Sequence, residues 1–433
     1  MPQPPNTPAD PIAAAFAFAD FAAAIGRQAA EGLIQRHVPD TCGDRQTRFR
    51  FMDVDQKLDA LRLRGDPDPK LTAIMDAVAT DGGRTIPSWQ NVFDFKVKLA
   101  TDRRLDLKRF PKGAAYLPPL RQWASTIQLP PGTDKPRLRR AGKFFAPRLI
   151  SIVMILGTSS LLEAYASGKG VHVLFQTKQL SKQTNRRLAE SLAFVMDACE
   201  PNAYRPGGHG LDAIRKIRLM HECIRWEIEH YAIKLGKPRP PLWDPQVYGR
   251  PINGEDLLGM MLGFSRVITR DLPKIGEDVK PEDAEDYRYL WDVIGGLLGV
   301  EAELRPRTVD EAADLFCVIK RRQQTESSPD GIEMASALLD FYTHGIPLLP
   351  DDVKSWIKGF VVALSRSLVG DWVCDLVGFP PSYALEELVA IDAVAAIEVI
   401  GRAVLLQTGL YPGKLFGGVK PYKIPRSLQG ALA

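Results

Sequence analysis

The sequence predicts an all-α protein, and three observations favour this fold class. Long segments between residue 149 and residue 408 repeat their apolar residues at helical spacing. No alternating strand pattern longer than a few residues interrupts them. Hydrophobic residues make up 45% and charged residues 25% of the 433 positions, which is typical of a globular chain with a sizeable buried core.

The N-terminal third contains short or weak helical patterns. Four prolines in the first ten residues predict an irregular lead-in, and an Ala-rich helix is expected over residues 11–36. That helix could touch a membrane, but the absence of a Lys/Arg-rich face favours a position on the protein surface. Short helices are expected over residues 52–100, separated by Asp-Pro and Gly-Gly. Residues 101–150 are rich in proline and basic, which favours a solvated linker; docking to an anionic membrane surface or an acidic partner is the alternative.

The remaining helices are long and carry their own start signals. Thr308 and Glu311 form a capping box, and Pro281 with Glu282 suits a first helical turn. The expected helices span residues 149–166, 181–199, 211–234, 255–270, 281–298, 308–323, 330–343, 351–375 and 383–408. We expect a lead-in (1–10), a helical cap with a basic linker (11–145), a helical core (146–410) and a C-terminal tail (411–433).

Charge and cysteine usage exclude several classes of protein. A net charge of +4 over this length gives no support for nucleic-acid binding. Five cysteines lie far apart without a C-x-x-C pair, which predicts reduced thiols in a cytosolic protein and no disulfide framework. The N-terminus lacks the basic residues of a secretory signal, and the apolar run 149–162 is too short for the roughly 20 residues of a membrane span. Peripheral membrane contact stays open.

Among the six histidines, His221 has the most distinctive surroundings. Arg218 and Arg225 fall on its helical face, with Ile214 and Ile217 one turn earlier. Two cations would lower the pKa of the imidazole and leave a neutral nitrogen for metal binding or base chemistry. A packed histidine with surface arginines is the plain alternative. The pattern also suits a haem, which needs an axial imidazole, cations for its propionates and an apolar pocket.

Other chemistries have weaker support. Glu227 and His230 form a Glu-x-x-His element, but a di-iron bundle needs two of these and the chain has one. There is no G-x-S-x-G and no phosphate-binding loop. Cys223 lies on a different helical face from His221, which argues against a thiolate ligand there.

The segment from about residue 150 to 380 resembles the oxygenase family that groups the catalytic domain of latex clearing protein (rubber oxygenase) with the fungal mycophenolate-pathway oxygenase. The matching stretches are RLAESLAF (187–194), IRLMHECIR (217–225), WDP (243–245), GRPINGED (249–256), Gly259 to Ser265, and YLW-x-x-x-G-x-x-x-G (289–299). The resemblance implies an all-α, globin-like core that holds one b-type haem, with His221 as the proximal iron ligand. It also implies a distal Arg-x-x-Lys-Thr element, which here becomes Arg187, Glu190 and Ser191.

Two departures from the family pattern bear on chemistry. Glu190 replaces the distal Lys, so the resting iron site could be open, water-filled or bound by a harder carboxylate. Met260 stands where the family often has Thr and makes that wall less polar. Glu190 is also the candidate for a catalytic base, while Arg187 and Ser191 would hydrogen-bond oxygen and Arg218 and Arg225 would hold propionates or neighbouring carboxylates. For Arg187, a structural pair with Glu190 is the alternative.

The resulting prediction is a haem-dependent oxygenase that uses O₂ on an apolar, unsaturated or isoprenoid small molecule. A haem-binding protein without oxygenase turnover is the second hypothesis, because the distal residues are changed. A helical scaffold without cofactor is the third, and it requires His221 to be a packing residue.

Overall fold

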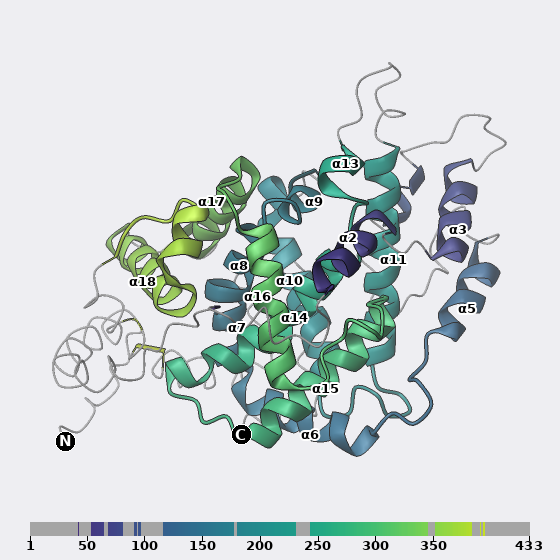
Figure 1. Ribbon diagram of the computed structural model, residues 1–433, viewed down its shortest axis with the longest axis horizontal. Coiled ribbons are helices and arrows are strands. Elements are labelled where there is room, and N and C mark those ends of the chain that lie inside the picture. The colour runs from purple at the N-terminus through teal and green to yellow at the C-terminus, as the bar shows by residue number, and fades with distance from the viewer. Residues whose placement is uncertain are drawn as a thin grey trace.

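A computed structural model describes residues 42, 53–64, 68–80, 91–92, 94–96, 116–176, 180–230, 243–344, 351–382, 390 and 393–394, with backbone alone for 180–189 and 352–353. Within these ranges every regular element is a helix and none is a strand, which confirms the all-α prediction (Figure 1). The expected helices at 11–36 and, for the most part, 383–408 lie outside the described residues.

The helices before the core are α2 (Val54–Arg64), α3 (Pro69–Ala79), α5 (Leu117–Thr126) and α6 (Lys135–Phe145). A rod follows, built from η4 (Ala146–Arg148), α7 (Leu149–Ile155), the π-helical η5 (Leu156–Ser160) and α8 (Leu161–Tyr165). Then come α9 (Val171–Gln176), α10 (Leu180–Cys199), α11 (Gly210–Glu229), α13 (Pro245–Tyr248) and α14 (Gly254–Asp271). The last are η6 (Pro273–Ile275), α15 (Pro281–Leu298), α16 (Val309–Gln323), α17 (Pro329–His344) and α18 (Asp351–Leu376).

Helix α14 lies at the centre of the fold and packs against α2, α15, α16 and the α7–α8 rod (Figure 1). Its start is fixed locally by Asn253, whose side chain accepts hydrogen bonds from the backbone of Glu255 (3.0 Å) and Asp256 (3.1 Å). The Asp256 carboxylate returns a bond to the Asn253 amide, which completes a capping box. This central position lets α14 carry one wall of the candidate site.

The continuous helical stretch Lys135–Tyr165, made of α6 and the rod, is long and apolar enough to cross a membrane, judged by length and composition alone. Most of that stretch is buried against other helices, as in the core helix of a soluble protein. The requirement for close packing is clearest at Gly157, where a Cβ atom would lie 1.7 Å from the Tyr342 hydroxyl. The rod is therefore a structural axis of the core.

The basic stretch before residue 150 is not a solvated linker throughout. Asp134 caps α6 by accepting from the Arg137 amide at 2.9 Å, and the apolar side chains of α6 pack on α15. Arg137 and Arg140 both bind Asp286 of α15, at 2.7 and 2.6 Å. The cations that suggested a linker are the polar side of an amphipathic helix, and Pro136 is accommodated in its first turn.

The expectation of five reduced thiols is wrong for two of them. Cys42 is joined to Cys317 of α16 by a disulfide, whereas Cys199, Cys223 and Cys374 are free and buried. The two bonded cysteines are 275 residues apart, so their spacing in the sequence gave no sign of the pairing. The cytosolic location rested on reduced thiols and stays a prediction without that support.

Candidate cofactor site around helix α11

Helix α11 carries His221 near its middle and packs against α10, α3 and α15. Its buried residues repeat at helical spacing, from Ala213 and Ile214 to Ile224 and Ile228, so the helix is fixed on more than one side. His221 itself is half-buried. The imidazole thus lies on a rigid element within the core, where a ligand to a metal or cofactor would be held in place.

The two arginines beside His221 both bind carboxylates in the structure. Arg218, one turn before it, lies 3.4 Å from Asp68 and donates to the Leu297 carbonyl at 3.1 Å. Arg225, one turn after it, is buried and pairs with Glu222. Its other nitrogens donate to the backbone carbonyls of Pro251 and Ile252, both at 3.1 Å. Arg225 therefore ties α11 to the turn that precedes α14.

The residues predicted for the distal side lie on α10, the neighbour of α11. The Glu190 side chain is half-buried and that of Ser191 is exposed, while the Arg187 side chain is outside the described part of the structure. The fold thus brings the helices that carry Glu190 and His221 together. The assignment of Arg187, Glu190 and Ser191 to catalysis stays a prediction.

Although α14 is central to the fold, the apolar side chains along one strip of its surface are partly exposed to solvent. Met260 is 37% exposed, and Leu257 and Phe264, a turn to either side, are half-buried. Leu257 packs with the small cluster that includes Ile224 and Ile228 of α11. Phe264 stacks on the buried Trp291 with 5.0 Å between ring centroids. An open apolar strip that adjoins the helix of His221 is suited to a flat apolar group.

Asp256 stands at the start of the same strip, one turn before Met260. Burial raises the pKa of Asp256 to about 7, and the negative charge of Glu255 adds to this shift. The Asn253 amide and two arginines, Arg62 and Arg225, act in the opposite direction and are outweighed. The sequence did not mark this residue, because the largest cause of its raised pKa is burial in the folded chain.

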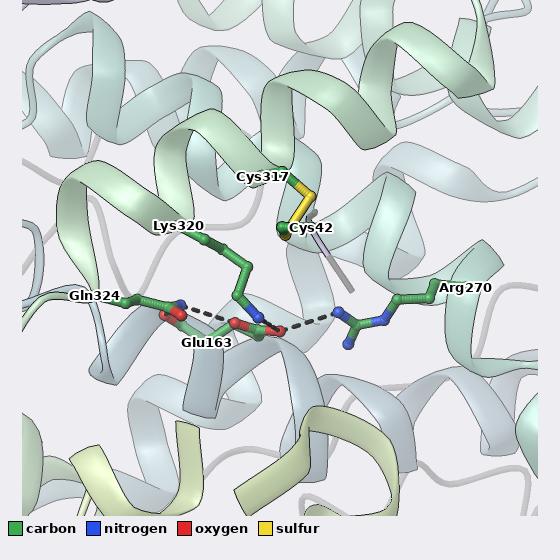
Figure 2. Close-up of a disulfide and its surroundings, with 6 residues drawn as sticks. All are labelled: Cys42, Glu163, Arg270, Cys317, Lys320 and Gln324. Carbon is green, nitrogen blue, oxygen red and sulfur yellow. Dashed lines mark hydrogen bonds and ion pairs between the residues drawn. A yellow bond between two sulfur atoms is a disulfide. The ribbon is translucent and has the colours of Figure 1, made fainter. Parts of the chain in front are cut away.

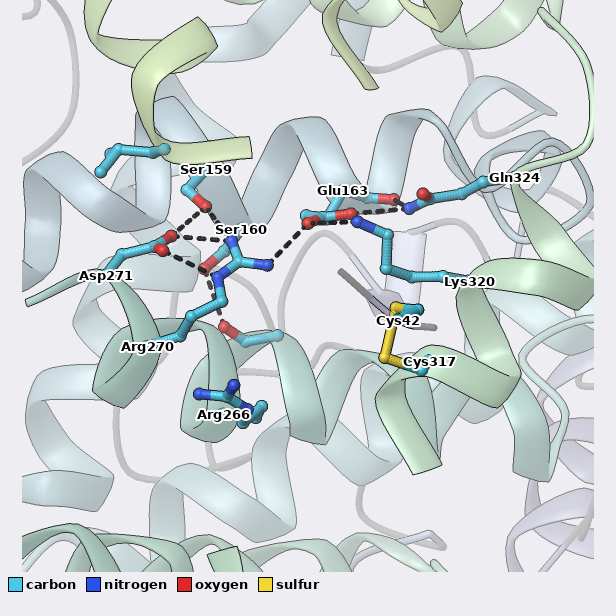
Figure 3. Close-up of polar contacts among 12 residues, drawn as sticks. Cys42, Ser159, Ser160, Glu163, Arg266, Arg270, Asp271, Cys317, Lys320 and Gln324 are labelled. Carbon is cyan, nitrogen blue, oxygen red and sulfur yellow. Dashed lines mark hydrogen bonds and ion pairs between the residues drawn. A yellow bond between two sulfur atoms is a disulfide. The ribbon is translucent and has the colours of Figure 1, made fainter. Parts of the chain in front are cut away.

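Behind α14, a buried ionic network joins the rod to α14 and α16 (Figure 3). Arg270 donates to Glu163 at 3.0 Å and to Asp271 at 2.7 Å, and Ser159 donates to Asp271 at 2.6 Å. Lys320 and Gln324 of α16 bind Glu163 from the other side, at 3.0 and 2.8 Å. The disulfide at Cys317 lies one turn before Lys320 on the same helix (Figure 2).

Both carboxylates of this network stay ionised. Burial alone would raise the pKa of Glu163, but Lys320 and Arg270 outweigh it and lower that pKa. In the same way Arg270 and Lys274 overcome burial and lower the pKa of Asp271 to about 2. Because arginine, lysine and glutamine side chains from α14 and the end of α16 neutralise or hydrogen-bond both carboxylates, we assign this network to structure.

The alternative Glu-x-x-His pair is divided between separate partners. Glu227 pairs with the buried Lys96, and His230 stacks on Trp226 with ring centroids 4.1 Å apart. Across the described ranges no three His, Cys, Asp or Glu side chains are grouped as a metal site of this kind would need. The geometry gives the di-iron hypothesis no support.

Comparison with known proteins agrees with the all-α fold and with the family resemblance of the sequence. Residues 148–400 match the family described as "ER-bound oxygenase mpaB/B'/Rubber oxygenase, catalytic domain". The chain is 25% identical over 287 residues to the rubber oxygenase of Streptomyces sp. (strain K30), an overlap of 66% of this chain and 63% of that protein. It therefore spans somewhat less than two thirds of that relative.

A solved structure extends this likeness to three dimensions. It is titled "Structure of Latex Clearing Protein LCP in the closed state", and it covers 84% of this chain and 87% of its own at a TM-score of 0.55 and 20% identity. At this identity the likeness speaks for the fold alone. Because the family match covers more than half of the chain, the protein belongs to the family of the mpaB/rubber oxygenase catalytic domain.

Proposed function

We propose that this protein is a b-type haem-dependent oxygenase that acts on an apolar, unsaturated or isoprenoid small molecule. The observation that carries the proposal is His221, an imidazole in the middle of a packed helix, in the element to which the family resemblance assigns the iron ligand. Membership of an oxygenase family supports the reaction class. The haem, its ligand and the substrate class are our inference from the residues.

The residues around α11 fit a haem in three respects. His221 supplies one neutral nitrogen donor, the type of ligand that holds iron in many haem proteins. The strip Leu257–Met260–Phe264 supplies open apolar surface for a macrocycle. Arg218 is a part-exposed cation one turn from His221 and is suited to a propionate. Arg225 has its donors engaged by Glu222 and two carbonyls, so we assign it to holding α11.

The distal roles are assigned to α10. A bound haem, held by His221, would supply the activation of O₂. Arg187 and Ser191 would orient the oxygen by donating hydrogen bonds, and Glu190 would accept a proton from the substrate. Because Glu190 replaces the family's Lys, the side chain that could close the site with an amine is absent at this position.

The proposed substrate class follows from the side chains of the exposed apolar strip on α14. Met260 contributes a thioether and Phe264 an aromatic ring, neither of which offers a strong hydrogen-bond donor. Selection among molecules on such a surface depends on apolar area and shape. The relative whose name specifies rubber acts on a polymer of isoprene units, and for this chain we propose a small molecule with similar double bonds.

The test is a set of absorption spectra of protein expressed with a haem supply, in the ferric, ferrous and ferrous-CO forms. We expect a Soret band at one haem per chain and a CO adduct, with the band lost or strongly shifted in His221→Ala. His230→Ala is the matched control, since His230 is the C-cap residue of the same helix and is also half-buried. A band that responds equally to both variants, or no band at all, would reject the assignment.

The same spectra separate the second hypothesis. A haem protein without turnover would bind haem through His221 but fail to consume O₂ with any unsaturated substrate. An oxygenase must bind CO in the ferrous state at an exchangeable position, followed by substrate-dependent O₂ uptake.

A further inference from the structure

Helix α3 lies before the matched family domain, and yet it contacts the helix that carries His221 along three successive turns. The Asp68 carboxylate lies 3.4 Å from the guanidinium of Arg218. The Thr72 hydroxyl donates to Glu222 at 2.8 Å, and Trp226 Nε1 donates to Asp76 at 3.0 Å. Figure 1 shows α3 beside α11 at one edge of the molecule.

The register of these contacts is regular. Positions 68, 72 and 76 are four apart, as are positions 218, 222 and 226, and both sets increase in the same direction. The two helices therefore run parallel with matched turns. Between the polar contacts, Met75 and Cys223 bring their sulfur atoms within 3.4 Å in the buried core. The three polar contacts, which we call the polar ladder, have apolar side chains packed between them. Together they favour one register of the two helices.

The first and the middle contact of the ladder are anchored further. Asp68 accepts from the amide of Lys70 at 3.2 Å as the N-cap of α3, and from Trp123 Nε1 of α5 at 2.6 Å. Glu222 also pairs with Arg225, which binds the turn before α14. Helix α11 is consequently held between α3 on one side and the start of α14 on another. His221 lies one turn from Arg218 and is the immediate neighbour of Glu222 in the chain.

We propose that α3 is a positioning element for the cofactor ligand: Asp68, Thr72 and Asp76 fix the rotation and height of α11, and Asp68 sets the charge beside His221 by neutralising Arg218. This inference rests on the proposed haem function for its electrostatic part. The positioning part concerns the two helices alone. The segment before the family domain thereby becomes part of the site.

The electrostatic part of the proposal predicts the direction in which the midpoint potential of the haem changes. If Asp68 loses its charge, Arg218 loses one compensating carboxylate, and the net charge one turn from the proposed iron ligand becomes more positive. A nearby positive charge disfavours the ferric state relative to the ferrous state, so the midpoint potential becomes more positive. Asp68→Asn removes this charge and keeps the N-cap, because its one side-chain oxygen can still accept from the Lys70 amide, while the bond that Asp68 Oδ2 accepts from Trp123 Nε1 is lost.

The positioning part is tested by hydrogen–deuterium exchange on the protein as purified, with the variants Thr72→Val and Asp76→Ala, each of which removes one hydrogen bond to α11. We expect exchange of the α11 amides around Glu222 to become about fivefold faster, as loss of one hydrogen bond implies. Thr80→Val is the matched control, since the Thr80 hydroxyl bonds only carbonyls of its own helix in the described structure. Unchanged α11 exchange in both variants would overturn the proposal.

The electrostatic part is tested by potentiometric titration of haem-loaded Asp68→Asn. Asp53→Asn, directly before α2, is the control, with the same change of charge at an exposed position. A more positive potential in Asp68→Asn alone supports the proposal, and equal potentials in both variants contradict it. If the wild-type chain binds no haem, the proposed function has failed, and the exchange experiment still decides whether α3 positions α11.

Discussion

The Nη2 atom of Arg225 donates to the carbonyl oxygen of Ile252 at 3.1 Å. Ile252 has a φ of 54°, a backbone region that β-branched residues rarely adopt. It directly precedes the N-cap of α14, so Arg225 stabilises a strained turn at the start of the central helix. One side chain thus links the helix of His221 to the helix of Met260.

Replacing Arg225 should therefore be costly. In Arg225→Met the buried Glu222 loses its ion pair and two carbonyls lose a donor, so we expect the free energy of unfolding to fall by about 3–5 kcal/mol. Urea denaturation measures it. Arg215→Met is the control on the same helix, with an expected loss of roughly 1 kcal/mol. Adding Glu222→Gln to Arg225→Met should recover part of the loss, and strictly additive effects would contradict the pairing.

The raised pKa of Asp256 predicts that the free energy of unfolding decreases as the pH rises. Its pKa changes from 3.8 to about 7 on folding, so between these values the folded state binds a proton that the unfolded state has released. The difference of about 3 pH units corresponds to at most about 4 kcal/mol lost between pH 4 and pH 7. Asp256→Asn should unfold at higher denaturant concentration than wild type at pH 8 and at a similar one at pH 4. An equal difference at both pH values would rule out the raised pKa.

For Asp271 we expect the opposite effect of pH on the free energy of unfolding. Its folded pKa of about 2 lies below the ordinary 3.8, so it contributes stability above pH 4 that is lost as the pH falls through 2. The difference of about 1.8 pH units is worth about 2 kcal/mol. We expect Asp271→Asn to be less stable than wild type by at least that amount at pH 7, with a smaller gap at pH 2.5. A gap that does not change with pH would show that Asp271 gains nothing from Arg270 and Lys274.

The disulfide can be tested chemically, without an activity assay. Alkylation of denatured protein without reductant should modify three cysteines, Cys199, Cys223 and Cys374, and all five after reduction. Peptide mapping should recover Cys42 linked to Cys317. Because the bond closes a loop of 275 residues, Cys317→Ser should lower the free energy of unfolding by roughly 2–5 kcal/mol. Five modified thiols before reduction would remove the bond from the structure.

Glu190 is the candidate base, so Glu190→Gln should lower kcat by roughly 100-fold or more once a substrate is identified, with haem content unchanged. The measurement is substrate-dependent O₂ uptake across pH. Glu229→Gln provides the control, as Glu229 is a carboxylate on α11 that pairs with Arg250 near the surface. Undiminished turnover in Glu190→Gln would exclude it as the base.

Local signals predicted most helix positions. Pro281 begins α15 and Thr308 caps α16, both as expected, because the hydrogen-bonding needs of a helix start are met by residues nearby in the chain. Helix α6 was missed, since proline and clustered arginines look alike in a linker and in a helix whose polar side meets Asp286.

The candidate site was predictable in part for the same physical reason. His221, Arg218 and Arg225 share one helix, so their neighbourhood follows from spacing alone. The partners of those arginines do not: Asp68 lies 150 residues before Arg218, and Ile252 belongs to a turn whose strain is a property of the folded chain. The raised pKa of Asp256 likewise depends on packing that no local pattern encodes.

The π-helical turn Leu156–Ser160 has a consequence for comparing this chain with its relatives. Each helical residue advances the direction of its side chain by about 100°, and a π turn holds one residue more than an α turn between bonded groups. The π turn therefore shifts by one position the residue of the following helix that faces Arg270 and Lys320, and in this chain that residue is Glu163. In evolutionary terms the turn behaves as a one-residue insertion: where a relative lacks it, we expect the residue aligned with Glu163 to point elsewhere and the buried ionic network to be replaced.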